Sequence, residues 1–146
     1  MKIASPAFLN NAKIPSEYTC DDENISPPLQ FIDVPRDTQS LVLIVDDPDA
    51  PAKTWVHWVV YNIDRGVQDV RENSIPKGGI LGMTDFGRPG WGGPCPPSGS
   101  HRYFFKLYAL DRILDLPEGM TKQQLLEKMS DHVLEQAQLI GIYSRK

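Results

Sequence analysis

The chain has 146 residues, and its 15 Lys and Arg against 19 Asp and Glu give a formal net charge of −4. This length suits a single domain over residues 1–146 with a sizeable core. No basic run is present to follow a phosphate backbone, so nucleic acid is not an expected partner. No apolar stretch approaches the roughly 20 residues that cross a bilayer, and the first residues lack the apolar segment of a signal peptide. We therefore expect a cytoplasmic chain with no stable membrane insertion.

Short strands joined by turns are predicted for the first two-thirds of the chain, where Pro and Gly separate runs rich in Val, Ile and aromatic residues. A segment near Ile3 and residues 29–32 are the weaker candidates. The continuous apolar run of residues 41–45 predicts a strand covered on both faces, as in the middle of a β-sandwich. Residues 56–63 and 101–110 are the next clear strands.

A long glycine-rich and proline-rich stretch, residues 77–100, separates the last two of these strands. Unstructured loops of this length are uncommon in compact domains and tend to be functional or disordered. Phe86, Arg88 and Trp91 favour an ordered loop in this case. The sequence therefore predicts a functional loop between two strands.

A single helix is predicted, in the C-terminal region. Thr121 and Gln124 form a capping-box pattern, and Gly141 is a plausible stop. The apolar positions at helical spacing are Leu125, Met129, Val133 and Ile140. We expect an amphipathic surface helix with a packing role.

The two cysteines, Cys20 and Cys95, are too few for a disulfide framework, and they lack the close Cys or His spacing of structural zinc sites. Taken by themselves, these residues favour free thiols that are buried or that line a loop.

A stiff acidic turn follows the buried strand, because prolines at positions 48 and 51 restrict the backbone around Asp47 and Asp49. Aspartates beside proline are common in ordinary turns, where they bind their own backbone. From this motif alone the turn is the favoured interpretation.

Two histidines change that balance. At strand periodicity His57 shares a face with Trp55 and Val59 and lies opposite Val56, Trp58 and Val60, while His101 shares a face with Tyr103 and Phe105. If Asp47 or Asp49 accepts a hydrogen bond from one imidazole nitrogen, the carboxylate favours the protonated ring. The other nitrogen then points a donor at an anion, and the backbone N–H groups near Gly93 add further donors. His132, on the polar part of the helix, is expected to be structural.

The same cluster admits a second interpretation. Two histidines and one or two carboxylates are a recognised ligand set for zinc or non-haem iron, which would suit a metal-assisted hydrolase. We rank it lower, since the sequence contains none of the common hydrolase or phosphate-loop motifs. Cys95 lies between prolines without a visible activating base. We therefore expect no enzyme activity, no resident metal and no cofactor.

Three spaced motifs resemble one known family. They are Asp47-Pro48-Asp49-Ala50-Pro51, Trp55-Val56-His57-Trp58, and Gly93-Pro94 followed by Gly99-Ser100-His101-Arg102-Tyr103. In this order they resemble the phosphatidylethanolamine-binding protein family, in particular its short prokaryotic, Raf-kinase-inhibitor-like branch. The resemblance also covers Ile25-Ser26-Pro27-Pro28-Leu29, so it runs through nearly the whole chain.

The resemblance implies a mainly β fold, an antiparallel β-sandwich with a small anion pocket at one end. Phosphate, acetate or a phospholipid head group would sit in that pocket. Carried over by position, the ligand-binding residues are Asp47, Asp49, Trp55, His57, Gly93, His101 and Tyr103, with Asp49 and Trp55 in supporting roles. Family members are described as head-group binders or as modulators of kinases and proteases, and several prokaryotic ones look like homodimers, so the resemblance implies a kinase, a protease or a second copy of the chain as candidate partners.

Two departures from the eukaryotic pattern matter. Cys95 stands where a second proline follows Gly-Pro, so the pocket rim differs, and the chain stops at Lys146 without the extra closing helix. A membrane lipid specificity is therefore doubtful. Because some prokaryotic relatives carry a cysteine pair at comparable places, the resemblance makes a contact between Cys20 and Cys95 a hypothesis.

The leading expectation is thus a binding or regulatory protein for a small phosphorylated anion. The alternatives are the metal-assisted hydrolase and an inhibitor that acts on a kinase or protease through its exposed loops. For such an inhibitor, removal of His101 would spare inhibition, while changes in the long loop would not.

Overall fold

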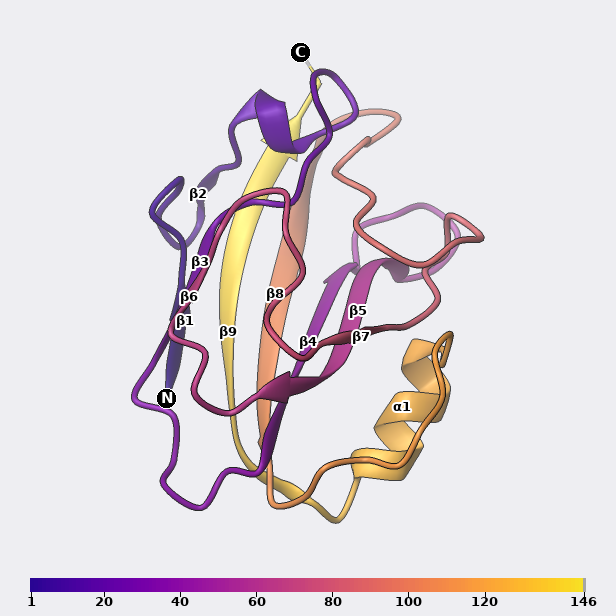
Figure 1. Ribbon diagram of the computed structural model, residues 1–146. Helices are drawn as coiled ribbons and strands as arrows, with labels where there is room; N and C mark the ends of the chain where they lie inside the picture. The colour runs from indigo at the N-terminus through magenta and orange to yellow at the C-terminus, as the bar shows by residue number, and fades with distance from the viewer. Residues whose placement is uncertain (146) are drawn as a thin grey trace.

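Two β-sheets and one short helix make up the fold in the computed structural model, which describes residues 1–145 (Figure 1). The smaller sheet has the strand order β1-β3-β6, and the larger has the order β2-β9-β8-β4-β5-β7. All neighbouring strands are antiparallel except β2 and β9, which are parallel. The strands of the smaller sheet are Lys2–Ala4, Leu29–Ile32 and Asp69–Val70. Those of the larger, in chain order from β2, are Ala12–Lys13, Ser40–Asp47, Trp55–Asp64, Ile80–Leu81, Ser100–Leu110 and Val133–Ser144.

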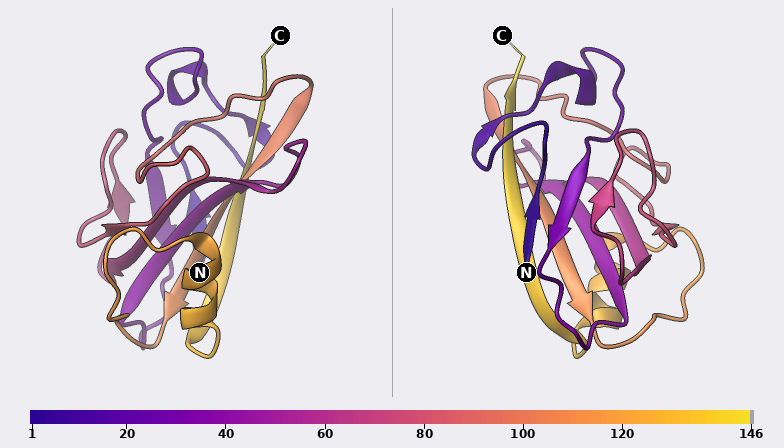
Figure 2. Two further views of the ribbon diagram at one scale, coloured as in Figure 1. Left: turned by 90° about the vertical axis from the view of Figure 1, so that its right-hand side faces the viewer. Right: turned by 60° about the vertical axis from the view of Figure 1, so that its left-hand side comes forward.

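Strand β4 forms the middle of the structure, and every one of its residues is buried. Leu41, Leu43 and Val45 face a core shared with the smaller sheet, whereas Val42 and Ile44 face a second core under the helix α1, Lys122–Met129. Figure 2 shows the smaller sheet against one face of the larger sheet and α1 against the other. The prediction that residues 41–45 form a strand covered on both faces is confirmed.

The helix is much shorter than the sequence predicted. The predicted start is confirmed, because the capping box of Thr121 and Gln124 is present. The predicted end is wrong: α1 stops at Met129 and does not continue to Ile140. Residues from Val133 onward instead form β9, which pairs with β8 along nearly its whole length. Gly141 is not a helix stop: it lies within β9, where an added Cβ would come within 2.5 Å of the Ile14 side chain.

His132 accordingly does not lie on a helix. It occupies the connection between α1 and β9, where its Nδ1 lies 3.0 Å from Asp111 Oδ1. The structural role expected for it is consistent with this surface contact.

Strand β5 contains an irregularity at His57. Val45 of β4 pairs with Trp58 and Asp46 pairs with Val56, so His57 is an extra residue on its strand. Such a bulge interrupts the alternation of faces and re-aims a side chain. Val56 and Trp58 consequently join different cores, and the prediction that they share a face is wrong.

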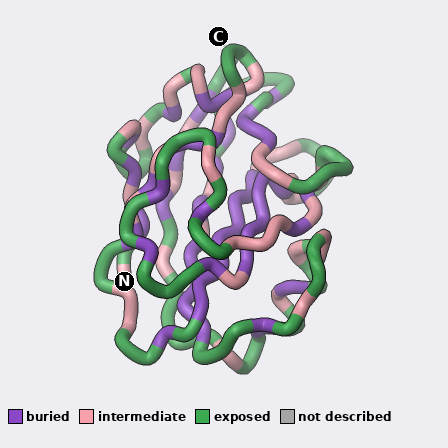
Figure 3. The backbone as a smooth tube through the Cα atoms, viewed as in Figure 1, coloured by how far each residue is buried: buried purple, intermediate pink, exposed green. Residues whose placement is uncertain are grey.

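The long loop is ordered, and the short strand β7 lies within it. Trp91 lies against Trp58 and Phe105, with ring centroids 5.4 and 6.0 Å apart. Figure 3 shows the buried backbone concentrated in the central strands, with exposed segments at the periphery. Within residues 1–145, no helix has the length and apolar character needed to cross a bilayer.

Candidate anion-binding site

The topology brings three strand ends together. β4 runs antiparallel to both β5 and β8, so its last residues lie beside the first residues of its two neighbours. Asp47 therefore meets the beginning of β5, which carries His57, and the beginning of β8, which carries His101. Residues separated along the sequence are placed at one end of the larger sheet.

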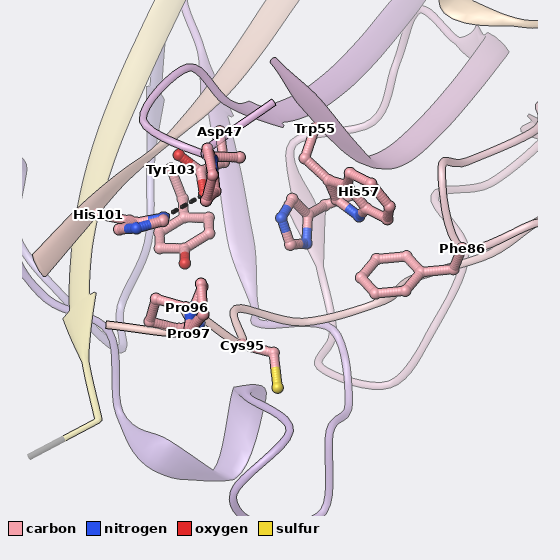
Figure 4. Close-up of a pocket in the computed structure, with 11 residues that line it drawn as sticks. Asp47, Trp55, His57, Phe86, Cys95, Pro96, Pro97, His101 and Tyr103 are labelled. Atoms are coloured by element: carbon pink, nitrogen blue, oxygen red, sulfur yellow. Dashed lines mark hydrogen bonds and ion pairs between the residues drawn. The ribbon is translucent and has the colours of Figure 1, made fainter. Parts of the chain in front are cut away.

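A cavity of about 250 Å³ lies at this end. One side, which we call the sheet wall, consists of Asp47, Trp55, His57, His101 and Tyr103. The opposite side, which we call the loop wall, consists of Phe86, Cys95, Pro96 and Pro97, with Ala50 and Pro51 completing the lining. Figure 4 shows the two imidazoles on either side of Tyr103, with the two prolines facing them.

Asp47 and His101 form a buried pair. The Nδ1 of His101 lies 2.6 Å from Asp47 Oδ2, and the two residues are only 6% and 3% exposed. The other carboxylate oxygen of Asp47 accepts the backbone N–H of Asp49 at 2.7 Å. The carboxylate thus fixes the ring orientation of His101, as the sequence predicted for one of the two aspartates.

His57 has a different partner. Its Nδ1 lies 2.6 Å from the carbonyl oxygen of Gly92, which can only accept, so the proton sits on Nδ1. Burial lowers the pKa of His57 below its ordinary value of 6.5, and the Gly92 hydrogen bond and the nearby Asp47 only partly oppose this. In the neutral ring Nε2 is an acceptor, whereas the sequence-based expectation was a donor.

Aromatic rings hold both imidazoles in place. His57 packs edge-on against Tyr103 and Phe86, with centroids 5.2 and 5.3 Å apart, and His101 stacks on Tyr103. Burial, reinforced by the charges of Asp47 and Asp49, raises the pKa of Tyr103. Its hydroxyl therefore stays protonated and can donate to a ligand.

Asp49 does not line the cavity. Its carboxylate binds Arg102 through Nε and Nη2 at 2.9 and 2.8 Å and also accepts the Arg102 backbone N–H. These hydrogen bonds lower the pKa of Asp49 to about 2. The residue therefore ties the turn after β4 to β8 from outside.

Gly93 is also absent from the lining, and its predicted place in the pocket is wrong. Its N–H donates to Asn24 Oδ1 at 2.9 Å, and an added Cβ would lie 2.4 Å from the Tyr18 carbonyl oxygen. Glycine is needed here for close packing against another loop. Its neighbour Gly92 contributes instead, through the carbonyl that orients His57.

Cys20 and Cys95 form a disulfide with a Cα to Cα distance of 5.4 Å. The expectation of free thiols, based on the two residues alone, is wrong, and the pairing implied by the family resemblance is confirmed. Cys95 belongs to the loop wall, so the cross-link attaches that wall to the loop that carries Cys20.

Metal ligation finds little support in the geometry. Within the described part of the chain, no group of three or more His, Cys, Asp or Glu side chains is arranged to hold a metal ion. The Nδ1 atoms of both pocket histidines already have protein partners. A metal would have only the two Nε2 atoms and a carboxylate already bound to His101.

The fold is thus two packed β-sheets with a cavity lined by two histidines and an aspartate at one end of the larger sheet. The family model for phosphatidylethanolamine-binding protein matches residues 4–144. The chain belongs to the phosphatidylethanolamine-binding protein family.

Several relatives match the whole chain. A UPF0098 protein from Methanothermobacter thermautotrophicus is 52% identical, covering 99% of each chain, and one from Chlamydia pneumoniae is 45% identical with the same coverage. Among solved structures, the phosphatidylethanolamine-binding protein homolog CT736 from Chlamydia trachomatis has a TM-score of 0.96 and 43% identity, covering 99% of this chain and 97% of its own. YbcL from E. coli has a TM-score of 0.92 and 28% identity, covering 99% and 98%.

Proposed function

We propose that this protein binds a small anion, a phosphate or a phosphorylated head group, in the cavity at one end of an antiparallel β-sandwich. One observation carries the proposal. His57 and His101, which are distant in sequence, both contact the ring of Tyr103 in a single cavity, and one of them is paired with a buried carboxylate. Family membership supports a binding or regulatory role.

The hydrogen-bonding groups suit a phosphate that carries one proton. A protonated His101 donates one N–H to Asp47 and has the other for a ligand oxygen. The hydroxyl of Tyr103 adds a donor, whereas neutral His57 offers an acceptor to a P–OH group. A phosphate or phosphomonoester with one protonated oxygen satisfies all three side chains.

The size of the cavity restricts the ligand. A volume of about 250 Å³ is roughly that of eight liquid waters, and it is below the range of about 300–1,000 Å³ typical of drug-sized ligands. It suits a phosphate with a small organic substituent. Acyl chains would remain outside, so the proposal concerns the head group and not a whole lipid.

The test is a titration followed by the ring resonances of the histidines in a ¹H–¹⁵N spectrum. Inorganic phosphate and phosphoethanolamine are added separately at pH 6.5. The signals of His57 and His101 should move in a saturable way, while those of His132, on the Asp111 contact, should stay in place. Unchanged pocket signals at millimolar ligand would contradict the proposal.

Modulation of a kinase or protease, and assembly into a homodimer, remain proposals that rest on the resemblance. The metal-assisted hydrolase is distinguished by elemental analysis of protein purified without added metal. A stoichiometric transition metal would favour that alternative over simple anion binding.

A further inference from the structure

Residues 95–99, which carry three of the four loop-wall residues, have very few attachments. The Pro94 carbonyl accepts the N–H of Cys20 at 3.1 Å, and the next backbone pairing begins at Ser100 in β8. Between them, residues 95–99 form no hydrogen bond with any part of residues 1–145. Apart from packing, the disulfide is what holds this segment over the cavity.

The partner loop around Cys20 is much better anchored. The Tyr18 hydroxyl donates to Glu72 at 2.8 Å, and Asp21 accepts from Tyr143 at 2.6 Å and from Arg145 at 3.1 Å. The cross-link therefore joins a fixed loop to a segment with no polar contacts of its own. Opening it would release the Cys95 side and leave the Cys20 side in place.

The disulfide is also accessible. Cys95 is exposed and Cys20 is partly exposed, so the cross-link lies at the surface of the protein. Exposed disulfides are the ones most readily reduced or used for regulation, whereas structural disulfides resist reduction. The exposed disulfide is therefore also the one that attaches a wall of the cavity.

We propose that Cys20–Cys95 is a site of thiol–disulfide exchange for a dithiol reductant, and that its reduction loosens the loop wall and weakens anion binding. This inference rests on the proposed function. The reductant thiolate attacks Cys95 Sγ, which forms a mixed disulfide as the bond to Cys20 breaks and the Cys20 thiolate takes up a proton. The second reductant thiol then displaces Cys95, so the dithiol is oxidised to a disulfide and both cysteines become thiols.

The experiment compares phosphate binding by the oxidised protein, by the protein reduced with dithiothreitol under native conditions, and by the double variant Cys20→Ser with Cys95→Ser. The chain has no other cysteine, so the reductant should have no effect on the double variant, which serves as the matched control. We expect the Kd for phosphate to rise at least tenfold on reduction. The double variant should show the same weak binding with and without reductant, and all three proteins should keep the same β-rich circular dichroism spectrum.

Coupling must also run in the reverse direction, because linkage between two equilibria is reciprocal. If reduction weakens binding tenfold, saturating phosphate lowers the reduction midpoint potential of the disulfide by about 30 mV. A redox titration with and without phosphate measures this shift.

Three outcomes would overturn the inference. The disulfide resists dithiothreitol in the folded protein, the reduced protein binds phosphate within twofold of the oxidised one, or the whole fold is lost on reduction. If phosphate binds neither form, the proposed function fails. The redox effect is then judged without ligand, since the ring signals of His57 and His101 should still shift on reduction in the parent protein and not in the double variant, and unchanged signals would refute it.

Discussion

The two walls of the cavity are built in opposite ways. The sheet wall consists of side chains on paired strands, and its two histidines are each held by a hydrogen-bond partner, Asp47 for His101 and the Gly92 carbonyl for His57. Three of the four loop-wall residues, Cys95, Pro96 and Pro97, lie on residues 95–99, which form no hydrogen bond within residues 1–145 and are attached by a disulfide. The comparison teaches that the polar groups are oriented by specific hydrogen-bond partners, whereas closure of the cavity comes from apolar packing and the disulfide. Substitutions in the two walls should therefore affect different properties.

The largest effect is expected beneath the sheet wall. Trp58 is 1% exposed and supports Trp91 at the base of the long loop. Trp58→Ala should lower the free energy of unfolding by about 3–5 kcal/mol, because it removes a large buried ring and leaves a cavity. Urea denaturation measures this, with Trp55→Ala, on a partly exposed ring, as the control expected to cost less than half as much. If Trp58→Ala costs less than about 1 kcal/mol, the contact between Trp58 and Trp91 does not hold the long loop against the sheet.

The next largest effect concerns binding. His101→Ala should raise the Kd for phosphate by about 10-fold to 100-fold, since a charge-assisted hydrogen bond contributes about 1.5–3 kcal/mol. Isothermal titration calorimetry measures the change, and His132→Ala is the matched control, expected to bind as the parent does. Equal losses in both variants would indicate a general effect on the fold and not a contact with the ligand.

The sheet wall was largely predictable from sequence, because its residues lie in strands with strong local signals. The strand at 41–45 is apolar throughout, and period-two alternation in β8 placed His101 and Tyr103 on one face. The bulge at His57 was not predictable, because it depends on how β5 registers against β4. The acceptor role of His57 Nε2 was not predictable either, because it follows from the Gly92 carbonyl that occupies Nδ1.

The C-terminal segment was misassigned because a local pattern competed with a long-range pairing. Val133 and Ile140 continue the spacing of α1, yet residues 139–143 also alternate as a strand does, with Leu139 and Tyr143 buried. Pairing with β8 over most of its length decided between them. The loop wall was less predictable still, since Pro96 and Pro97 have no signal that places them over a cavity formed elsewhere in the sequence.

The third prediction concerns pH and tests the protonation state of His57. Because burial lowers its pKa below 6.5, the unfolded chain binds more protons than the folded one in the window just below pH 6.5. The unliganded protein should therefore lose stability as the pH falls through that window. Chemical denaturation at pH 7.5, 6.5 and 5.5 measures this, and His57→Gln should flatten the dependence.

Anion binding should show the opposite trend. Neutral His57 accepts from a P–OH group, and a phosphomonoester acquires that proton only as the pH falls towards its second pKa of about 6. The affinity for phosphoethanolamine should therefore rise as the pH falls from 8 to 6, by at most about tenfold per unit for one proton. Sulfate, which carries no proton in this range, should bind more weakly than phosphate at pH 7.5. Equal affinity for the two anions would rule out an acceptor role for His57.

The fourth prediction concerns Phe86, on the loop wall. Phe86→Ala should raise the Kd for phosphate only a few-fold, because the ring is 38% exposed and packs on His57 without a polar contact to the ligand. Its cost in stability should stay below about 1 kcal/mol, as expected for a side chain that is only partly buried. Calorimetry and urea denaturation on the same sample separate the two effects. A loss of stability as large as that of Trp58→Ala would break the distinction between the walls.

The smallest effect is expected for Asp49, which the sequence placed in the site and the structure places behind it. Its bidentate contact with Arg102 is largely exposed to solvent, and such pairs contribute about 0–1 kcal/mol. Asp49→Asn should therefore lower the free energy of unfolding slightly and leave the Kd for phosphate within twofold of the parent. The same small cost should decline as the pH falls below the ordinary Asp pKa of 3.8, and it should vanish only below about pH 2, because the folded-state pKa of Asp49 is about 2. A tenfold loss of phosphate affinity in this variant would instead mean that the turn between β4 and β5 positions the ligand directly, and that the sheet wall extends beyond the five side chains assigned to it.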